Sequence, residues 1–169
     1  IDIAVVRLPH LSNFTDFDAL RGEPDVYVKV VHSPGDLGEP DALIIPGSKN
    51  TLGDLASLKE AGFAERIIKL ANGGKTEIIG ICGGFQMLGG EIQDSEGVDS
   101  SRRGAAGLGL LDVRTVMLQE KTLLRVTAEH VPSGLSVQGY EIHHGQTEII
   151  NGEALFVRAD KGIAGVGRS

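Results

Sequence analysis

Four short apolar runs rich in β-branched residues occupy the first half of the chain, and they limit the possible folds more than any other feature. They lie at residues 1–8, 26–31, 41–48 and 77–81. Runs of this length, bounded by Pro, Gly and Asp, are typical of buried β-strands. Over residues 52–70 the apolar positions instead recur at helical spacing, with Asn50 or Thr51 as the N-cap and Gly73 at the end.

The order strand, helix, strand predicts an α/β fold with a parallel sheet. A brief helix is expected over 84–88 and a loop over the Gly- and Ser-rich stretch 93–107. The remaining runs read as β-strands and lie at 110–117, 123–130, 139–150 and 154–160. We therefore expect one domain over residues 1–169: a mostly parallel, flavodoxin-like sheet with helices on both faces and an antiparallel β extension.

Composition excludes several classes of protein. The net charge is −7 and aromatic residues make up 4%, so the chain has neither the positive charge nor the stacking side chains for nucleic acid. No apolar run reaches the ~18 residues of a membrane span. A single cysteine forms no internal disulfide, which fits a reducing compartment. We expect a cytoplasmic protein that binds no membrane and no nucleic acid; the first residue, Ile1, hints at a segment upstream.

The stretch GICGGFQMLGG contains that cysteine, Cys82, directly after the fourth apolar run. Strand, nucleophile and short helix follow one another in a nucleophile elbow, whose sharp turn needs small neighbours such as Gly80, Gly83 and Gly84. The N–H groups at the start of the helix would lower the pKa of the thiol and stabilise an oxyanion. The alternative is a small buried hydrophobic residue, as most free cysteines are.

The sequence G-I-C-G-G-F-Q-M-L-G resembles the nucleophile motif of class I (triad-type) glutamine amidotransferases. Three further blocks, RLPHLSNFTDFDAL (7–20), IIPGSKNT (44–51) and GYEIHHGQTE (139–148), are similar to the C-terminal glutaminase domain of cobyric acid synthase. The four blocks occur in the same order as in that domain, and the resemblance runs through nearly the whole chain. The first block selects within the superfamily, because generic glutamine amidotransferases lack it.

The resemblance implies the roles of individual residues. Cys82 would attack the side-chain amide of glutamine, and backbone N–H groups of Gly83 and of the loop at Gly47 and Ser48 would form the oxyanion hole. Gln86 matches the family's glutamine that binds the substrate; alternatively it is a helix residue facing solvent.

The resemblance also implies the chain's cofactors and partners. The partners would be glutamine and an upstream synthetase domain of the same protein that amidates corrin carboxylates. The glutaminase domain itself would need no metal or cofactor, while ATP and Mg would serve the synthetase domain.

A cysteine nucleophile needs a base, and from the residues alone His143 or His144 is the candidate. They are adjacent on an expected strand, so they should point to opposite faces. The resemblance instead puts His143 in the wall of the glutamine site and the catalytic histidine in a later segment, roughly G-T-Y-x-H-G-x-F, which this sequence lacks. We therefore expect the domain to be incomplete at its C-terminus, or the base to be supplied differently. A third possibility is that His143 has a purely structural role.

Three other functions compete with this one. A glutaminase for another acceptor, cobyrinic acid a,c-diamide synthesis or a peptidoglycan precursor, would keep the chemistry. A non-catalytic glutamine-binding or docking module would explain the missing histidine, and a different thiol enzyme would share the elbow alone. Two apparent motifs carry no function: GGKT at 73–76 lacks the spacing of a phosphate-binding loop, and neighbouring strand histidines diverge too far for zinc.

Overall fold

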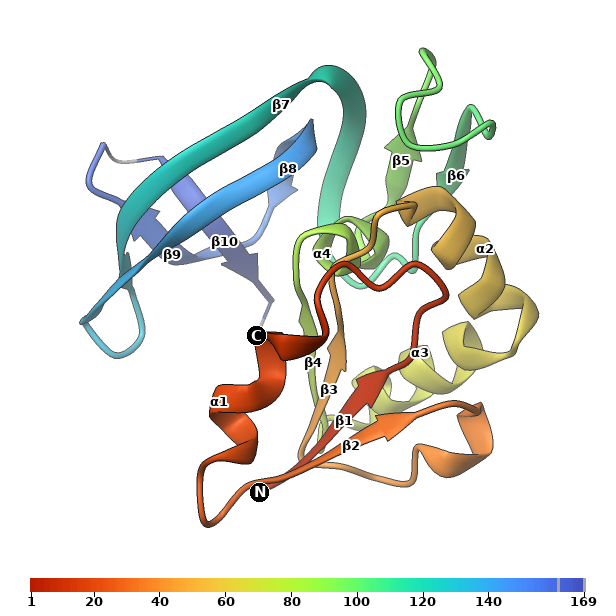
Figure 1. The fold of residues 1–169 in the computed structure, drawn as a ribbon, viewed down its shortest axis with the longest axis vertical. Coiled ribbons are helices and arrows are strands. Elements are labelled where there is room, and N and C mark those ends of the chain that lie inside the picture. Colours follow the sequence, from red (N-terminus) through yellow and green to blue (C-terminus); the bar gives the residue numbers. More distant parts are fainter. Residues whose placement is uncertain (161, 169) are drawn as a thin grey trace.

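A computed structural model describes residues 1–160 and 162–168, and a four-stranded parallel sheet forms its first half (Figure 1). Its strands are β1 (Asp2–Val6), β2 (Tyr27–Val31), β3 (Ala42–Ile45) and β4 (Glu77–Gly80). They run in the order β2-β1-β3-β4, and every pair is parallel. This order begins the flavodoxin-like sheet, as the sequence predicted.

Helices cover both faces of this sheet, because successive strand residues point to opposite sides. On one face lie α2 (Thr51–Glu60) and α3 (Phe63–Gly73), whose apolar side chains share a buried cluster with Ala4 and Val6 of β1. On the other face Ile3 and Val5 pack with Phe17, at the end of a 3-10 helix (Phe14–Phe17) that leads into α1 (Asp18–Arg21). A further 3-10 helix, Pro34–Asp36, follows β2.

The single helix predicted over 52–70 is wrong, because the structure has two. The break falls at Gly62, whose φ of +82° lies in the left-handed region that ends helices. The apolar pattern continues across the break because α2 and α3 pack into the same buried cluster. The N-cap is Asn50, whose side chain accepts a hydrogen bond from the backbone N–H of Gly53 at 2.9 Å.

A second, mixed sheet contains the remaining strands. They are β5 (Glu91–Gln93), β6 (Gly104–Ala106), β7 (Asp112–His130), β8 (Leu135–Asn151), β9 (Glu153–Arg158) and β10 (Ile163–Gly167). Among the residues that the structure describes, β5 and β7 pair in parallel and the other pairs of this sheet are antiparallel. The expected antiparallel extension is therefore present, and the stretch 93–107 contains β6 where only loop was predicted.

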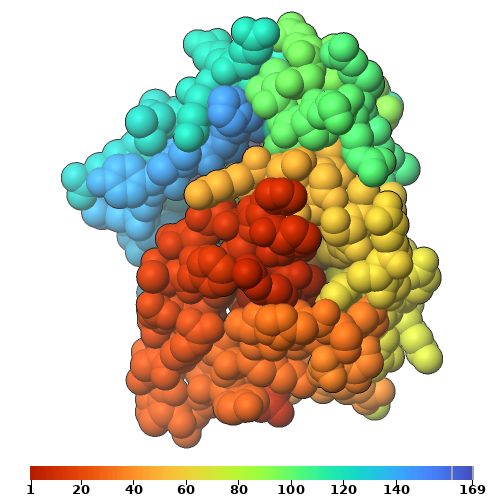
Figure 2. Space-filling view, turned by 45° about the vertical axis from the view of Figure 1, so that its right-hand side comes forward, coloured from red at the N-terminus to blue at the C-terminus, as the bar shows by residue number. Residues whose placement is uncertain are grey.

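The runs predicted as separate strands at 110–117 and 123–130 form one strand, β7. Its pairing with β8 shifts between Val116 and Lys121, opposite Gly145, which has a φ of +90°. The bulge lets β7 bend and continue across the residues at which the alternation of apolar and polar side chains is interrupted. The β7–β8 ribbon projects away from the parallel sheet in Figure 1, and its residues form the upper left part of the surface in Figure 2.

Candidate active site

The carboxyl edge of the parallel sheet carries a strained turn at Cys82. This residue links β4 to α4 (Gly83–Leu88) and has a φ of 51°. Among residues 1–160 and 162–168 no other non-glycine residue has a positive φ. Such strain persists only where the surroundings hold it, and it is frequent at functional sites.

Glycines make this turn possible. A Cβ on Gly84 would overlap the carbonyl oxygen of Ile45 in β3, and a Cβ on Gly80 would lie 2.6 Å from the backbone of Phe85. The helix therefore packs directly against the neighbouring strand. The structure has the strand, cysteine and helix order of the predicted elbow.

The loop after β3 lies beside the elbow, because β3 and β4 are neighbours. A Cβ on Gly47 would be 3.7 Å from the Cβ of Cys82, and a Cβ on Gly83 would be 3.1 Å from the backbone nitrogen of Ser48. Within the described residues, the backbone N–H groups of Gly47 and Ser48 have no hydrogen-bond acceptor. Gly47, Ser48 and Gly83 are thus brought together around the cysteine, with free donors in the loop.

The surroundings of Cys82 oppose formation of the thiolate. Although the residue is exposed, neighbouring protein limits hydration of the sulfur, and this desolvation raises the pKa of Cys82. The backbone N–H of Gly83 and the charge of Lys121 act in the opposite sense, while Asp16 and Asp99 add to the rise. The thiol therefore needs a base to react rapidly at neutral pH.

Strand β8 lies over the cysteine and over α4. The sulfur of Cys82 donates to the carbonyl oxygen of Ile142 at 3.5 Å. Gln86 is buried, and its amide nitrogen donates to the carbonyl oxygen of His144 at 3.0 Å. Its amide oxygen lies 3.5 Å from the hydroxyl of Thr51. Gln86 therefore ties α4 to β8 and to α2, and it does not face solvent.

His143 is half-buried on β8 and contacts neither Cys82 nor Gln86 by hydrogen bond. Its Nε2 lies 3.0 Å from the carboxylate of Glu141, and its Nδ1 lies 3.0 Å from the carbonyl oxygen of Gly145. His144 instead points its Nδ1 at the carbonyl oxygen of Leu118, so the two histidines do diverge. None of the five histidines, all of them in the described part of the chain, hydrogen-bonds to the sulfur.

Glu141, on β8 of the ribbon, belongs to a small ion-pair network with His143 and Arg158. Burial by itself would raise the pKa of Glu141, but hydrogen bonds from His143 and Arg158 outweigh it, so the pKa is lowered. Arg158 on β9 donates to Glu141 at 2.7 Å and to Asp160 at 3.1 Å. The network joins β8 to β9 near the cysteine.

A wide depression surrounds these residues, lined by Gly47, Ser48, Cys82, Gln86 and His143. Its volume is about 2290 Å³, against about 300–1,000 Å³ for typical small-molecule sites. It is an open trough between the edge strand β4 and the ribbon. Across the described ranges no helix is long and apolar enough to span a membrane, and no cluster of His, Cys, Asp and Glu could hold a metal.

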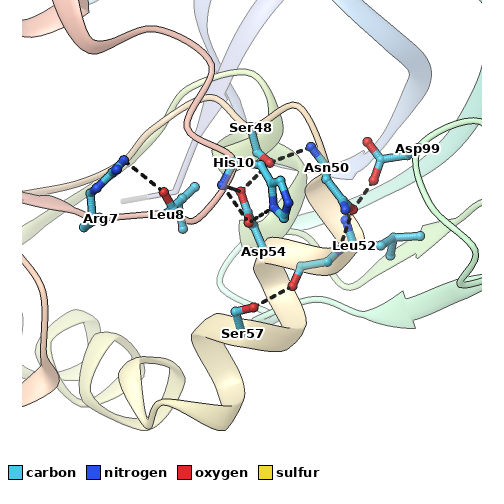
Figure 3. Close-up of polar contacts among 10 residues, drawn as sticks. Arg7, Leu8, His10, Ser48, Asn50, Leu52, Asp54, Ser57 and Asp99 are labelled. Atoms are coloured by element: carbon cyan, nitrogen blue, oxygen red, sulfur yellow. Dashed lines mark hydrogen bonds and ion pairs between the residues drawn. The ribbon is translucent and has the colours of Figure 1, made fainter.

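The sequence interpretation missed a buried group beside this site. Asp54 is fully buried on α2 and contacts both His10 and Ser48 (Figure 3). A signal was present, because Asp54 lies three residues after Thr51 and four before Leu58, which both face the core. A carboxylate on that face must be paired.

Comparison with known proteins agrees with this geometry. Residues 2–168 match the model of the CobB/CobQ-like glutamine amidotransferase domain. The cobyric acid synthase of Geobacillus thermodenitrificans is 48% identical over 154 residues, covering 90% of the chain and 31% of that protein. That of Nitratidesulfovibrio vulgaris is 49% identical over 179 residues, covering 87% and 33%. The adenosylcobalamin biosynthesis bifunctional protein CobDQ of Leptospira interrogans is 45% identical over 161 residues, covering 95% and 19%.

Solved structures share the fold at low sequence identity. A crystal structure of a glutamine amidotransferase superposes with a TM-score of 0.68 at 19% identity, covering 94% of this chain and 81% of that one. PurLQS from Thermotoga maritima gives a TM-score of 0.71 at 21% identity, covering 98% and 80%. The chain spans 19% to 33% of the length of the three curated relatives. By its sequence match over residues 2–168, the chain belongs to the CobB/CobQ-like glutamine amidotransferase family.

Proposed function

We propose that this chain hydrolyses glutamine through Cys82 and supplies the ammonia for amidation of corrin carboxylates, as a part of a cobyric acid synthase. The observation that carries the proposal is the strained turn at Cys82 beside the free N–H groups of Gly47 and Ser48. A nucleophile next to unoccupied backbone donors is the arrangement that acyl transfer needs.

The proposed reaction has two steps. The Cys82 thiolate adds to the amide carbon of glutamine, the C–N bond breaks, and a γ-glutamyl thioester and ammonia form. Water then adds to the thioester and releases glutamate and the thiol, so glutamine and water give glutamate and ammonia. In both steps the negative oxygen of the tetrahedral intermediate would accept hydrogen bonds from Gly83 and from the loop at Gly47 and Ser48.

A base must take the proton of Cys82 and pass it to the leaving ammonia. The raised pKa of the thiol strengthens this requirement. His143 is poorly placed for it, because both of its ring nitrogens already contact acceptors in β8. We propose that His143 and Gln86 shape the glutamine site and that the base comes from outside the described residues.

The acceptor is inferred from the relatives. The similar proteins include cobyric acid synthases, and the chain covers about a third of the length of these proteins or less. We propose that the remainder of such a protein uses ATP and magnesium to activate a corrin carboxylate, which the ammonia then converts to an amide. The glutaminase step needs no metal or organic cofactor.

The test uses the full-length protein with glutamine labelled with ¹⁵N at its side-chain amide. We expect ATP-dependent transfer of ¹⁵N into a corrin that carries free side-chain carboxylates. Cys82→Ser should abolish this transfer, while free ammonium should still support amidation by the variant. Labelled ammonia with no amidated corrin would show a glutaminase for another acceptor. Transfer from glutamine by the Cys82→Ser variant would overturn the proposed chemistry.

A further inference from the structure

We infer that Asp54 is a positioning residue that holds the loop of Gly47 and Ser48 in place for catalysis, with His10 as its partner. The inference rests on the proposed function of Cys82. It concerns a residue that makes no contact with the sulfur and that acts through the loop beside it.

Asp54 accepts hydrogen bonds from two different segments. One carboxylate oxygen lies 2.8 Å from Nδ1 of His10, and the other accepts from the hydroxyl of Ser48 at 2.6 Å. The backbone N–H of His10 lies 3.2 Å from both oxygens. The side chain of Asp54 is 0% exposed, so water does not compete for these bonds.

The Ser48 hydroxyl is fixed on both sides. It donates to Asp54 and accepts from the backbone N–H of Asn50 at 2.9 Å. These two bonds select one rotamer of Ser48, and they tie the loop to the first turn of α2 (Figure 3). Leu52 and Leu55 of α2 pack in the buried cluster on the sheet. The hydrogen bonds to α2 therefore hold the loop against a rigid part of the fold.

The segment around His10 closes the loop from its other side. Leu11 and Ser48 form an isolated antiparallel bridge, with hydrogen bonds from Lys49 N–H to His10 O at 2.8 Å and from Ser12 N–H to Gly47 O at 2.9 Å. Asp54 therefore binds one residue in each of the two bridged segments, His10 beside Leu11 and Ser48 itself. The bridge uses the carbonyl oxygen of Gly47 and leaves its N–H free.

This geometry gives the block at residues 7–20 a physical role. A Cβ on Gly47 would meet the Ser12 side chain at 2.5 Å and the Cys82 Cβ at 3.7 Å. The loop is thus confined between the His10 segment and the elbow. If Asp54 released it, the donors would move relative to the reacting carbon, and a displacement near 1 Å costs roughly 100-fold in rate.

The first variant is Asp54→Asn in the full-length protein. His10 and Ser48 bind different oxygens of Asp54, and asparagine replaces one of these oxygens with an NH2 group, which donates where the carboxylate accepts. We expect kcat for glutamate release to fall roughly 10- to 100-fold, with KM changed much less. Alkylation of Cys82 by iodoacetamide forms no oxyanion, so its rate should stay unchanged.

Asp94→Asn is the matched control. Asp94 is also a fully buried carboxylate, and it accepts backbone hydrogen bonds from Val98, Asp99 and Ser100. It contacts neither Ser48 nor the His10 segment. We expect this variant to lose stability but to keep kcat, which separates loop positioning from a general effect of losing a buried carboxylate.

A second pair of variants keeps the test decisive if Asp54→Asn does not fold. His10 is half-exposed, so we expect substitutions there to leave the fold intact. His10→Ala removes the Nδ1 donor and should lower kcat, whereas His10→Asn supplies an amide N–H at the equivalent position and should restore most of it. Equal rates for the two variants would overturn the role of the His10–Asp54 contact.

The remaining outcomes are distinct. Normal kcat in Asp54→Asn, or equal losses of kcat and of alkylation rate, would overturn the positioning role while the proposed function stands. No glutamate release by the unmodified full-length protein would overturn the proposed function and this inference with it.

Discussion

Cys82 combines backbone strain with an unfavourable electrostatic environment. Its φ of 51° exposes the sulfur at the end of β4, at a cost that is typically of order 1–3 kcal/mol for a residue in a sparsely populated region. Desolvation raises the pKa of the same thiol. The turn therefore presents the thiol of Cys82 without activating it, and the proposed reaction requires a base.

Alkylation of Cys82 at different pH values tests this environment. Because only the thiolate reacts, the rate should rise with pH and reach its midpoint above the ordinary cysteine value of about 8.5. Lys121→Gln removes a charge that lowers the pKa, so the midpoint should move up, and Asp16→Asn removes one that raises it, so the midpoint should move down. Shifts of the same sign in both variants would contradict the charge assignment.

Helix α4 depends on glycine where it meets β3. A Cβ at Gly84 would overlap Ile45 O, and no rotamer can relieve a clash with backbone. We expect Gly84→Ala to lower the free energy of unfolding by about 1–3 kcal/mol or more, measured by urea denaturation. Gly73→Ala is the control, because its Cβ meets nothing within 4 Å at the end of α3. That variant should be neutral or more stable by about 0.4–1 kcal/mol.

The ribbon should be sensitive to acid through Glu141. Its pKa is lowered in the fold, since hydrogen bonds from His143 and Arg158 outweigh the effect of burial. The stabilisation is therefore present above the unfolded value of about 4.3 and is lost as the pH falls through the lower folded value. Melting temperatures between about pH 5 and pH 3 should fall less steeply in Glu141→Gln. The exposed Glu153→Gln, as control, should keep the steep fall.

The elements that the sequence predicted are those with local signals. β-branched runs marked the strands of the parallel sheet, and the glycines around Cys82 marked the elbow. The break at Gly62 was missed because α2 and α3 share one apolar pattern, and β7 was divided because its bulge interrupts the alternation. The contact between His10 and Asp54 joins residues 44 positions apart, so the local pattern that places Asp54 on the buried face of α2 does not identify this partner.

At the scale of the molecule, two sheets meet at the cysteine. The parallel sheet supplies Cys82 and the loop of Gly47 and Ser48, and the mixed sheet lays Ile142 and His143 of β8 over them. The trough between the sheets has a volume of about 2290 Å³, which is larger than the ~300–1,000 Å³ of typical small-molecule sites. The match covers 33% of one relative and 19% of another, so these proteins extend well beyond the region that this chain matches.

The most direct test of the central claim is intact-mass spectrometry of the full-length protein after exposure to an electrophilic glutamine analogue. A single covalent adduct is expected; excess glutamine should prevent it, and Cys82→Ser should remove it. That result would show a glutamine-shaped site around a reactive Cys82. An unmodified protein, or an adduct that persists in Cys82→Ser, would contradict the account.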